Sequence, residues 1–376
     1  MRHNMIPISQ PALLGNEKKY LEECVESGWV SSAGHFIKDF EKKNCEYYNM
    51  QYAVAVSNGT VALHLALLAL GIGSGDEVIV PALTFVASIN AVFHTGATPV
   101  LADVEPDSWT IDIDRCHSLI TPKTKAIMPV HLYGQPCDMD KTMAFAKKFN
   151  LYVIEDCAEA HGAEVNGKKV GSFGDISCFS FYGNKIITTG EGGICLSNNE
   201  SLFNKMVILR DHGMSKTKRF WYDLIGYNYR MTNMQAAIGV AQIEKISEYL
   251  LKREEISNLY DNFLKDIPFL SLQKNISGRK KVCWLYSVLI DIDKLGMSVE
   301  KVSKKLTEMN VDNREFFQYF PGMIPYKNLI HNDLKNSFML SKTGINLPTF
   351  HQITPEEINY ICNCLINLKK RYNDSE

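Results

Sequence analysis

The chain has 376 residues, of which 45% are hydrophobic and 22% are charged, and its formal net charge is -2. This balance gives no reason to expect a nucleic acid or an anionic membrane surface as a partner. The longest apolar run, near residues 61–70, is too short to cross a bilayer, and the first residues lack the apolar core of a signal peptide.

Two domains are expected, because the chain exceeds the length at which a single hydrophobic core usually stops growing. Ten cysteines are scattered along it without a CxxC pair. This spacing does not match a zinc framework, so no metal site is predicted. It favours buried, reduced thiols in a cytoplasmic protein.

The first part of the chain contains helices, a strand and a turn with capping residues. Residues 16–27 and 35–48 have helical apolar spacing, and residues 52–56 predict a short strand. The turn Ser57-Asn58-Gly59-Thr60 follows and starts a helix that extends to Leu70. Free N–H groups at a helix start can bind an anion, although the same residues also serve as an ordinary cap.

Further apolar strands alternate with helical segments. They are expected at residues 76–81, 98–104, 125–130 and 151–156. This alternation predicts an α/β fold with a mostly parallel sheet, whose ligands lie beyond the carboxyl ends of its strands. Phe85 and His131 would both lie there. An aromatic side chain at this place either stacks on a ring-shaped ligand or fills the core.

Two carboxylates, Glu155 and Asp156, end the strand at residues 151–156. Such a pair is costly to bury unless each carboxylate is matched by cations or hydrogen-bond donors. One is therefore expected to face the ligand and the other a structural partner. Glu159 and His161 follow within five residues, and a histidine in that place is otherwise a structural, hydrogen-bonded residue.

A single lysine, Lys185, follows the apolar run at residues 176–181 and precedes the glycines of residues 190–193. The glycines allow tight turns and close approach to a ligand. A lysine at the end of a buried strand is either a salt-bridged structural cation or an amine kept partly neutral. A neutral amine can attack a carbonyl and form a Schiff base.

The later part of the chain predicts a second, smaller domain. Aromatic residues concentrate at 220–232, which indicates a binding loop or an oligomer interface. A helical pattern covers residues 233–249, and we place the domain boundary after it, giving a large domain over 1–250 and a small α+β domain over 251–376. The small domain is expected to hold a strand at 282–290, a helix at 298–309 and a closing helix at 356–372 with a basic end.

Four of these features complement one another: an anion cradle at Gly59 and Thr60, an aromatic ring at Phe85, an acid at Asp156 and an amine at Lys185. They are the parts that a phosphorylated pyridine aldehyde requires. Asp156 would keep the ring nitrogen protonated, and Lys185 would act as general acid and base.

The sequence resembles the DegT/DnrJ/EryC1/StrS family of sugar aminotransferases over almost its full length. The runs that carry the resemblance are residues 56–60, 75–85, 131–134, 155–160, 179–193 and 226–232. The resemblance implies the fold type I architecture of pyridoxal 5'-phosphate enzymes, with a large α/β domain and a smaller α+β domain. One branch of the family has His at the lysine position and acts as a dehydratase, and Lys185 argues against that branch.

The resemblance also implies roles for individual residues. Lys185 forms the Schiff base, Asp156 holds the pyridine nitrogen, Phe85 stacks on the ring, and Glu159 stands near the ring hydroxyl, where many relatives have Gln. The residues expected to bind the cofactor phosphate are Gly59, Thr60, Ser180 and, from the neighbouring subunit, Asn228. The chain is thus expected to form a homodimer with shared active sites.

The substrate end of the site is expected to involve His161 and Arg314. Arg314 lies in a run that resembles the family's arginine-aromatic loop, but Glu315 replaces the usual proline after the arginine. Arg314 is thus either a phosphate or carboxylate contact or part of a surface ion pair.

The implied activity moves an amino group from L-glutamate to C4 of a GDP-linked 4-keto-6-deoxy sugar, for surface polysaccharide biosynthesis. One alternative keeps the chemistry but uses another nucleotide keto-sugar or a small phosphorylated ketone. An alternative of another class is a non-catalytic regulator on the same fold.

Overall fold

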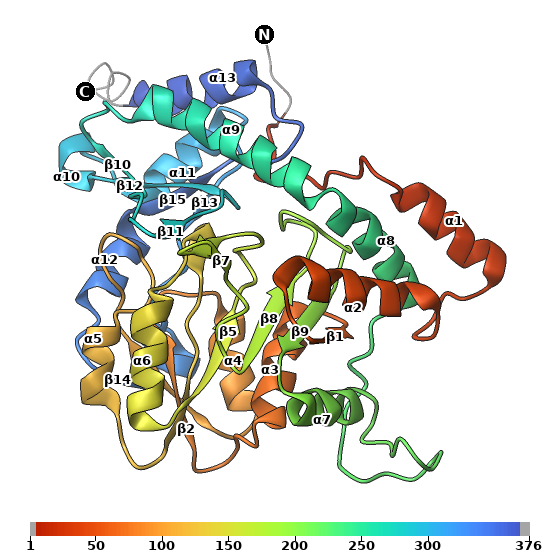
Figure 1. The fold of residues 1–376 in the computed structure, drawn as a ribbon. Coiled ribbons are helices and arrows are strands. Elements are labelled where there is room, and N and C mark those ends of the chain that lie inside the picture. Colours follow the sequence, from red (N-terminus) through yellow and green to blue (C-terminus); the bar gives the residue numbers. More distant parts are fainter. Residues whose placement is uncertain (1–4, 369–376) are drawn as a thin grey trace.

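The computed structural model describes residues 5–368, which contain three β-sheets (Figure 1). The largest sheet has eight strands in the order β1-β9-β8-β5-β4-β2-β3-β14, and all of them run parallel except β9. Their bounds are β1 Tyr52–Val56, β2 Glu77–Pro81, β3 Thr98–Ala102, β4 Thr124–Ile127, β5 Tyr152–Asp156, β8 Ile176–Ser180, β9 Gly193–Ser197 and β14 Ile330–His331. The predicted mostly parallel α/β sheet is confirmed.

Helices cover both faces of this sheet and make it the middle of three layers (Figure 1). Alternate strand residues point to opposite faces, so that in β1 Val54 packs into one core cluster and Ala55 into the other. One face is covered by α3 (Gly59–Ala69), α4 (Val86–His94) and α7 (Glu200–Arg210). The other is covered by α2 (His35–Tyr48), α6 (Met139–Phe149) and α8 (Asn233–Glu244), and α1 (Glu17–Ser27) packs on α8.

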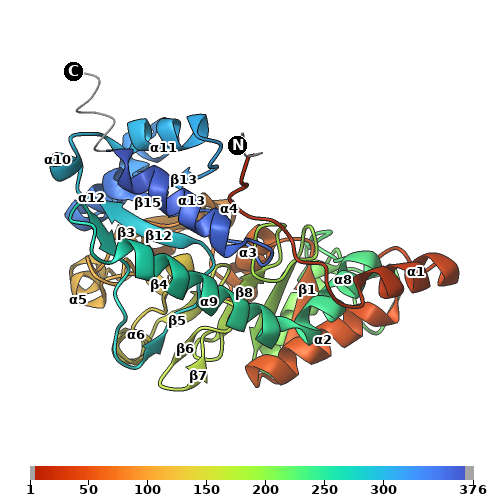
Figure 2. The same ribbon diagram turned by 90° about the horizontal axis from the view of Figure 1, so that it is seen from above.

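A smaller antiparallel sheet and its helices form a third core cluster. The sheet has the order β10-β12-β15-β13, with bounds Leu270–Leu272, Tyr286–Ile290, Gly344–Leu347 and Arg314–Glu315. The helices around it are α9 (Ile246–Leu264), α10 (Ile292–Leu295), α11 (Val299–Glu308), α12 (Lys335–Thr343) and α13 (Pro355–Ile366). Seen from above, α1, α2 and α8 lie at one end of the molecule, α11 and α13 lie towards the other, and α9 runs between them (Figure 2).

The third sheet is a small antiparallel one near the middle of the chain. It joins β11 (Arg279–Lys280) to the hairpin of β6 (Glu164–Val165) and β7 (Lys168–Lys169). The short helix α5 (Ile113–Cys116) precedes β4. In the part of the chain that the structure describes, we find no helix with the length and apolarity that a membrane span requires.

The structure refines three of the predicted elements. The helical pattern at 233–249 is broken at Lys245, which has φ -107° and ψ 2° and separates α8 from α9. The strand expected at 282–290 begins only at Tyr286, because the residues before it pack against the loop at 131–134 instead. The closing helix α13 ends at Ile366, and the basic residues expected at its end lie outside the described residues.

The predicted domain boundary after residue 250 stays a prediction. Helix α9 runs without interruption through residue 250, and β14, far beyond that position, pairs with β3 of the large sheet. The large and small sheets are therefore joined both by a continuous helix and by a strand that returns to the first sheet.

Candidate active site

The two adjacent carboxylates at the end of β5 have separate partners. Glu155 is fully buried and accepts hydrogen bonds from the N–H groups of Gly171, Phe173 and Gly174 at 2.7–2.8 Å. Burial raises the pKa of Glu155, but His131 and these N–H groups outweigh it and leave the pKa below its ordinary value. Glu155 is therefore the structural member of the pair.

Asp156 is the member that faces the site. Its carboxylate accepts a hydrogen bond from Ser88 Oγ at 2.8 Å and another from the Ala158 N–H at 3.2 Å. Burial raises the pKa of Asp156, while these two hydrogen bonds and the Lys185 ammonium oppose the rise. A carboxylate held in this way can keep a ring nitrogen protonated.

The start of α4 provides both the aromatic residue and the support for Asp156. Phe85 is the residue before the first turn of α4, and Ser88 lies within that turn. Thr84 Oγ1 lies 2.9 Å from Ser88 Oγ and fixes its orientation. Phe85 remains 53% exposed, with its ring centroid 5.6 Å from that of Phe317, so the ring is available for stacking at the edge of the site.

Lys185 lies opposite Glu159. Its Nζ is 3.9 Å from Glu159 Oε1, and its side chain is only 10% exposed. The backbone turn before it is closed by a hydrogen bond from the Lys185 N–H to the Tyr182 carbonyl at 2.9 Å. Burial lowers the pKa of Lys185, opposed by the carboxylates of Glu159 and Asp156. Burial thus favours the neutral form of the amine, which is the form that acts as a Schiff-base nucleophile.

The protonation states of Glu159 and Lys185 depend on each other. Its Oε2 accepts a hydrogen bond from the Tyr133 N–H at 2.9 Å. Burial raises the pKa of Glu159 to about 7, although the Lys185 ammonium and the Tyr133 N–H lower it in part. Near neutral pH Glu159 is therefore close to the midpoint between its protonated and ionised forms.

The cradle at the start of α3 lies directly against β8. Asn58 caps α3 by accepting a hydrogen bond from the Val61 N–H. The N–H groups of Gly59 and Thr60, at the first two positions of the helix, have no acceptor within it and can serve an anion. A Cβ placed on Gly59 would lie 2.7 Å from Ser180 Cβ and 3.1 Å from Ser180 Oγ. Only a glycine lets the helix start and the Ser180 hydroxyl approach one small anion together.

These residues fit pyridoxal phosphate. The cradle of Gly59, Thr60 and Ser180 suits its phosphate, Asp156 suits its ring nitrogen, and Lys185 suits its aldehyde. The structure thus brings most of the residues singled out in the sequence to the carboxyl ends of β5 and β8 and the start of α3.

Three of the predicted site residues lie elsewhere. His161 is buried, with Tyr48 Oη 2.9 Å from its Nδ1 and the Ser180 carbonyl 2.8 Å from its Nε2. This placement opposes the expected substrate contact and makes His161 a support for Ser180. Arg314 is exposed and forms an ion pair with Asp312. Asn228 is exposed on the loop before α8.

Sequence reasoning missed several residues of the site. Ser88 and Thr84 hold Asp156, Tyr133 holds Glu159, and Trp284 lies under Lys185, with its ring centroid 3.9 Å from Nζ. The only available signal was that Thr84 and Ser88 flank Phe85 at helical spacing. Tyr133 and Trp284 act through contacts across the fold, which no local pattern reveals.

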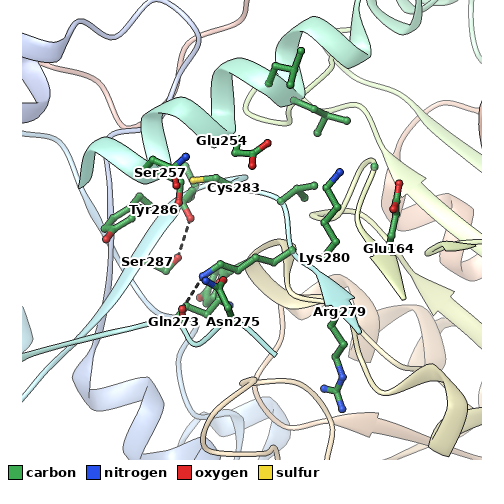
Figure 3. A pocket seen from close by; sticks show the side chains of 18 of the residues that line it. Glu164, Glu254, Ser257, Gln273, Asn275, Arg279, Lys280, Cys283, Tyr286 and Ser287 are labelled. Carbon is green, nitrogen blue, oxygen red and sulfur yellow. Dashed lines mark hydrogen bonds between the residues drawn. The ribbon is translucent and has the colours of Figure 1, made fainter. Parts of the chain in front are cut away.

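Tyr133 also lines a cavity of about 550 Å³, which lies between α9, β11 and the β6-β7 hairpin (Figure 3). Its wall mixes polar and apolar side chains and includes Glu254, Arg279 and Tyr286. Arg279 is already paired with Glu105 and Asp138. Neither Lys185 nor Asp156 lines this cavity, so it is separate from the site described above.

The fold and the site together define a pyridoxal phosphate-dependent aminotransferase. The model of the DegT/DnrJ/EryC1/StrS aminotransferase family matches residues 11–366, and the chain belongs to this family. The expected fold, enzyme class and cofactor are thereby confirmed.

Three known proteins illustrate the relationship. The chain is 46% identical to a GDP-perosamine synthase of Caulobacter vibrioides, over 96% of this chain and 97% of that one. It matches the structure of an aminotransferase from Psychrobacter cryohalolentis with a TM-score of 0.89 and 32% identity, over 97% and 99% of the two chains. The structure of a protein from Streptococcus pneumoniae described as a putative sugar aminotransferase, in its PMP form, matches with a TM-score of 0.90 and 28% identity, over 98% of this chain and 99% of that one.

The raised pKa of Glu159 predicts a pH-dependent stability of the cofactor-free protein. A carboxyl that binds its proton more tightly in the folded state loses stabilising free energy as the pH rises from its unfolded pKa, near 4.5, to about 7. Glu159→Gln removes this loss. The difference between the free energies of unfolding at pH 8 and at pH 5 should therefore become about 1–3 kcal/mol more favourable to pH 8 in the variant than in the wild type. Denaturant unfolding at the two pH values measures it.

Glu308→Gln, at an exposed position on α11, is the matched control and should leave that difference as in the wild type. If Glu159→Gln also left it unchanged, Glu159 would be ionised across the whole range and the shared proton would be refuted.

Proposed function

We propose that this enzyme transfers the amino group of L-glutamate to C4 of a GDP-linked 4-keto-6-deoxy sugar, for surface polysaccharide biosynthesis. The observation that carries the proposal is the 46% identity to a GDP-perosamine synthase over nearly the whole of both chains. The complete set of Lys185, Asp156 and the Gly59–Ser180 cradle supports it, because a non-catalytic regulator has no need of a lysine whose pKa is lowered by burial.

Bound pyridoxal phosphate supplies an electron-accepting ring that carries the amino group from donor to ketone. The residues of the chain provide the rest. Asp156, fixed by Ser88, holds a proton on the ring nitrogen, and Phe85 offers its exposed face for stacking. Ser180 and the start of α3 bind the phosphate through hydroxyl and N–H donors.

Lys185 Nζ moves the proton to and from the substrate carbon that carries the amino group. Burial keeps the pKa of this amine below its ordinary value, so it can take up a proton and release it again. Glu159, 3.9 Å away, shares that proton, since burial raises its own pKa to about 7. The low exposure of the pair keeps water from competing for the transfer.

A homodimer with shared sites is part of the proposal. The loop before α8 exposes large apolar side chains, including Phe220, Trp221, Tyr222 and Ile225, which is 93% exposed. Aromatic and aliphatic groups of this kind are enriched at protein–protein interfaces. Asn228, exposed on the same loop, is the residue that would reach the cofactor phosphate of a second subunit in this dimer.

A cytoplasmic location is also proposed. All ten cysteines lie within the described residues and each is a free thiol, and eight of them are buried in the core clusters. Unpaired thiols in this number are typical of a reducing compartment.

Spectroscopy and a substrate panel test the proposal. With L-glutamate, the near-visible absorption band of the bound cofactor should shift to that of its aminated form. The protein should then aminate a GDP-linked 4-keto-6-deoxy sugar with a kcat/KM at least about tenfold above those for dTDP- and UDP-linked analogues and a phosphorylated ketone.

A preference for another ketone would reject the GDP-sugar assignment and keep the transamination. If neither glutamate nor any other amino donor changed the spectrum, the protein would be a non-catalytic member of its family.

A further inference from the structure

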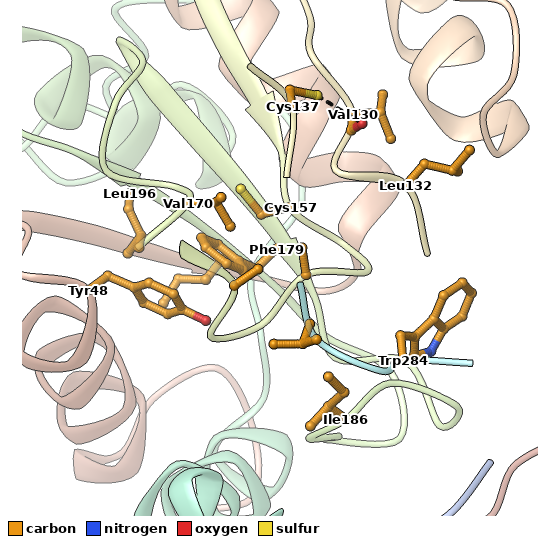
Figure 4. Close-up of a cluster of buried hydrophobic side chains, with 14 of the residues drawn as sticks. Tyr48, Val130, Leu132, Cys137, Cys157, Val170, Phe179, Ile186, Leu196 and Trp284 are labelled. Atoms are coloured by element: carbon orange, nitrogen blue, oxygen red, sulfur yellow. Dashed lines mark hydrogen bonds between the residues drawn. The ribbon is translucent and has the colours of Figure 1, made fainter. Parts of the chain in front are cut away.

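Trp284 contacts the lysine of the site from a distant part of the chain. It precedes β12, is 4% exposed, and places the centre of its ring 3.9 Å from Lys185 Nζ. Trp284 belongs to the same buried cluster as Ile186, the residue that follows Lys185 (Figure 4). The segment that follows β8 of the large sheet and the segment that precedes β12 of the small sheet therefore meet at this amine.

The position of the Trp284 ring is fixed from several sides. Its indole N–H donates to the Asn184 carbonyl at 2.8 Å, and its own carbonyl accepts from Arg253 on α9 at 3.2 Å. The Tyr133 ring lies nearly parallel to it, with an interplanar angle of 16° and centroids 6.2 Å apart. Because Asn184 directly precedes Lys185, the indole N–H also fixes the turn that carries the lysine.

The segment before Trp284 is equally constrained. The Val282 N–H donates to the Gly134 carbonyl at 3.1 Å, and a Cβ on Gly134 would overlap the Val282 carbonyl. Gly134 has φ 85°, a conformation that glycine adopts readily. Because its N–H and its backbone are both held in this way, the Trp284 ring has little freedom to move with Lys185. The position of the ring therefore determines where the lysine amine rests.

Three titratable groups interact electrostatically with Lys185: Glu159, Asp156 and His161. Glu159 Oε1 is 3.9 Å away, Asp156 raises the pKa of Lys185, and Lys185 in turn helps to keep the pKa of His161 low. Trp284 differs from all three, because an indole face attracts a cation without exchanging a proton with it.

In an aminotransferase the lysine is released from the cofactor while the cofactor carries the amino group. We infer that Trp284 positions the released Lys185: its ring face holds Nζ beside Glu159, and its N–H holds the preceding turn. Trp284 is thus a positioning residue that acts through Lys185. The inference rests on the aminotransferase chemistry and is independent of which ketone is the substrate.

This role has a measurable consequence in the cofactor-free protein. A ring face under the amine stabilises its charged form and opposes the effect of burial, so loss of the ring leaves more neutral amine at a given pH. Carbamylation by cyanate requires the neutral amine. We expect Trp284→Leu to raise the rate at Lys185 about three- to tenfold at pH 7.5 and to shift the pH profile towards acid.

Peptide mass spectrometry of cyanate-treated protein, sampled over time at several pH values, measures this rate. Trp284→Phe keeps a ring face and should stay within about twofold of the wild type. Phe263→Leu, which removes a partly exposed ring on α9, is the matched control and should have no effect. If circular dichroism shows that Trp284→Leu is unfolded, Trp284→Met, with a larger flexible side chain, takes its place.

Coinciding profiles for wild type and Trp284→Leu overturn the inference. A Trp284→Phe profile equal to that of Trp284→Leu also overturns it, because the effect would then come from the lost N–H bond and not from the ring. In the loaded enzyme, Trp284→Leu should lower kcat with glutamate several-fold and leave KM nearly unchanged. Failure of the GDP-sugar assignment would alter none of these results.

Discussion

Lys185→Ala should lower turnover by about four orders of magnitude or more, because both the covalent attachment and the proton transfer at the substrate carbon are lost. The variant should still bind part of the cofactor through the Gly59–Ser180 cradle and Asp156, none of which contacts Nζ directly in the structure. Steady-state kinetics and the cofactor content after dialysis measure the two effects. Turnover within tenfold of the wild type would exclude Lys185 as the catalytic lysine.

The same variant tests whether the sites are shared. If Asn228 serves the partner's site, mixing refolded Lys185→Ala subunits with Asn228→Ala subunits should produce hybrid dimers with one complete site each. Random pairing then restores about a quarter of the wild-type activity. Lys185→Ala mixed with Asn262→Ala, at an exposed position on α9, is the control for the mixing itself. No gain above the Asn228→Ala homodimer would place Asn228 outside the partner's site.

Asp156→Asn is expected to have the second largest effect, a fall in kcat of about three orders of magnitude. The substitution preserves shape and keeps an acceptor for Ser88 Oγ, but a neutral amide does not hold a proton on the ring nitrogen. The cofactor content should stay near one per site, since the phosphate cradle is unchanged. Kinetics with glutamate and the ketone, together with absorption spectra, measure both quantities.

Ser88→Ala weakens the hydrogen bonding of Asp156 without removing its charge, and its effect is to be compared with that of Asp156→Asn. It removes one of the two hydrogen bonds to the carboxylate and leaves the Ala158 N–H in place, so kcat should fall by no more than about tenfold. If Asp156→Asn were as mild as Ser88→Ala, the charge of Asp156 would have no special role, and the ring nitrogen would have another partner.

The sequence predicted the parts of this site that lie on regular elements. A buried strand ending in two acids, a lysine after a buried strand and a capping turn before a helix are local patterns, and the structure brings them together at one sheet edge. The local pattern of two adjacent acids did not by itself distinguish Asp156 from Glu155, and the family resemblance made the choice. The structural distinction depends on three N–H groups that lie 16–19 residues further along and bind Glu155.

What the sequence could not predict depends on contacts between distant segments. His161 looked suitable for a substrate contact, and only the fold shows its ring enclosed between Tyr48 and the Ser180 carbonyl. The strand expected from residue 282 begins further along the chain, because the Val282 N–H donates to the Gly134 carbonyl of the loop at 131–134. The roles of Trp284 and Tyr133 depend on the same kind of long-range packing.

The pairing of β14 with β3 bears on how the protein is made on the ribosome. Residues 330–331 form β14, the last strand at the β3 side of the large sheet. Ile6, near the other end of the chain, bridges to Val311. Until those late residues emerge, β3 presents a row of unpaired backbone groups to its surroundings. The nascent sheet is therefore exposed to wrong pairing for most of translation, and a chain cut after residue 250 would keep that exposure permanently.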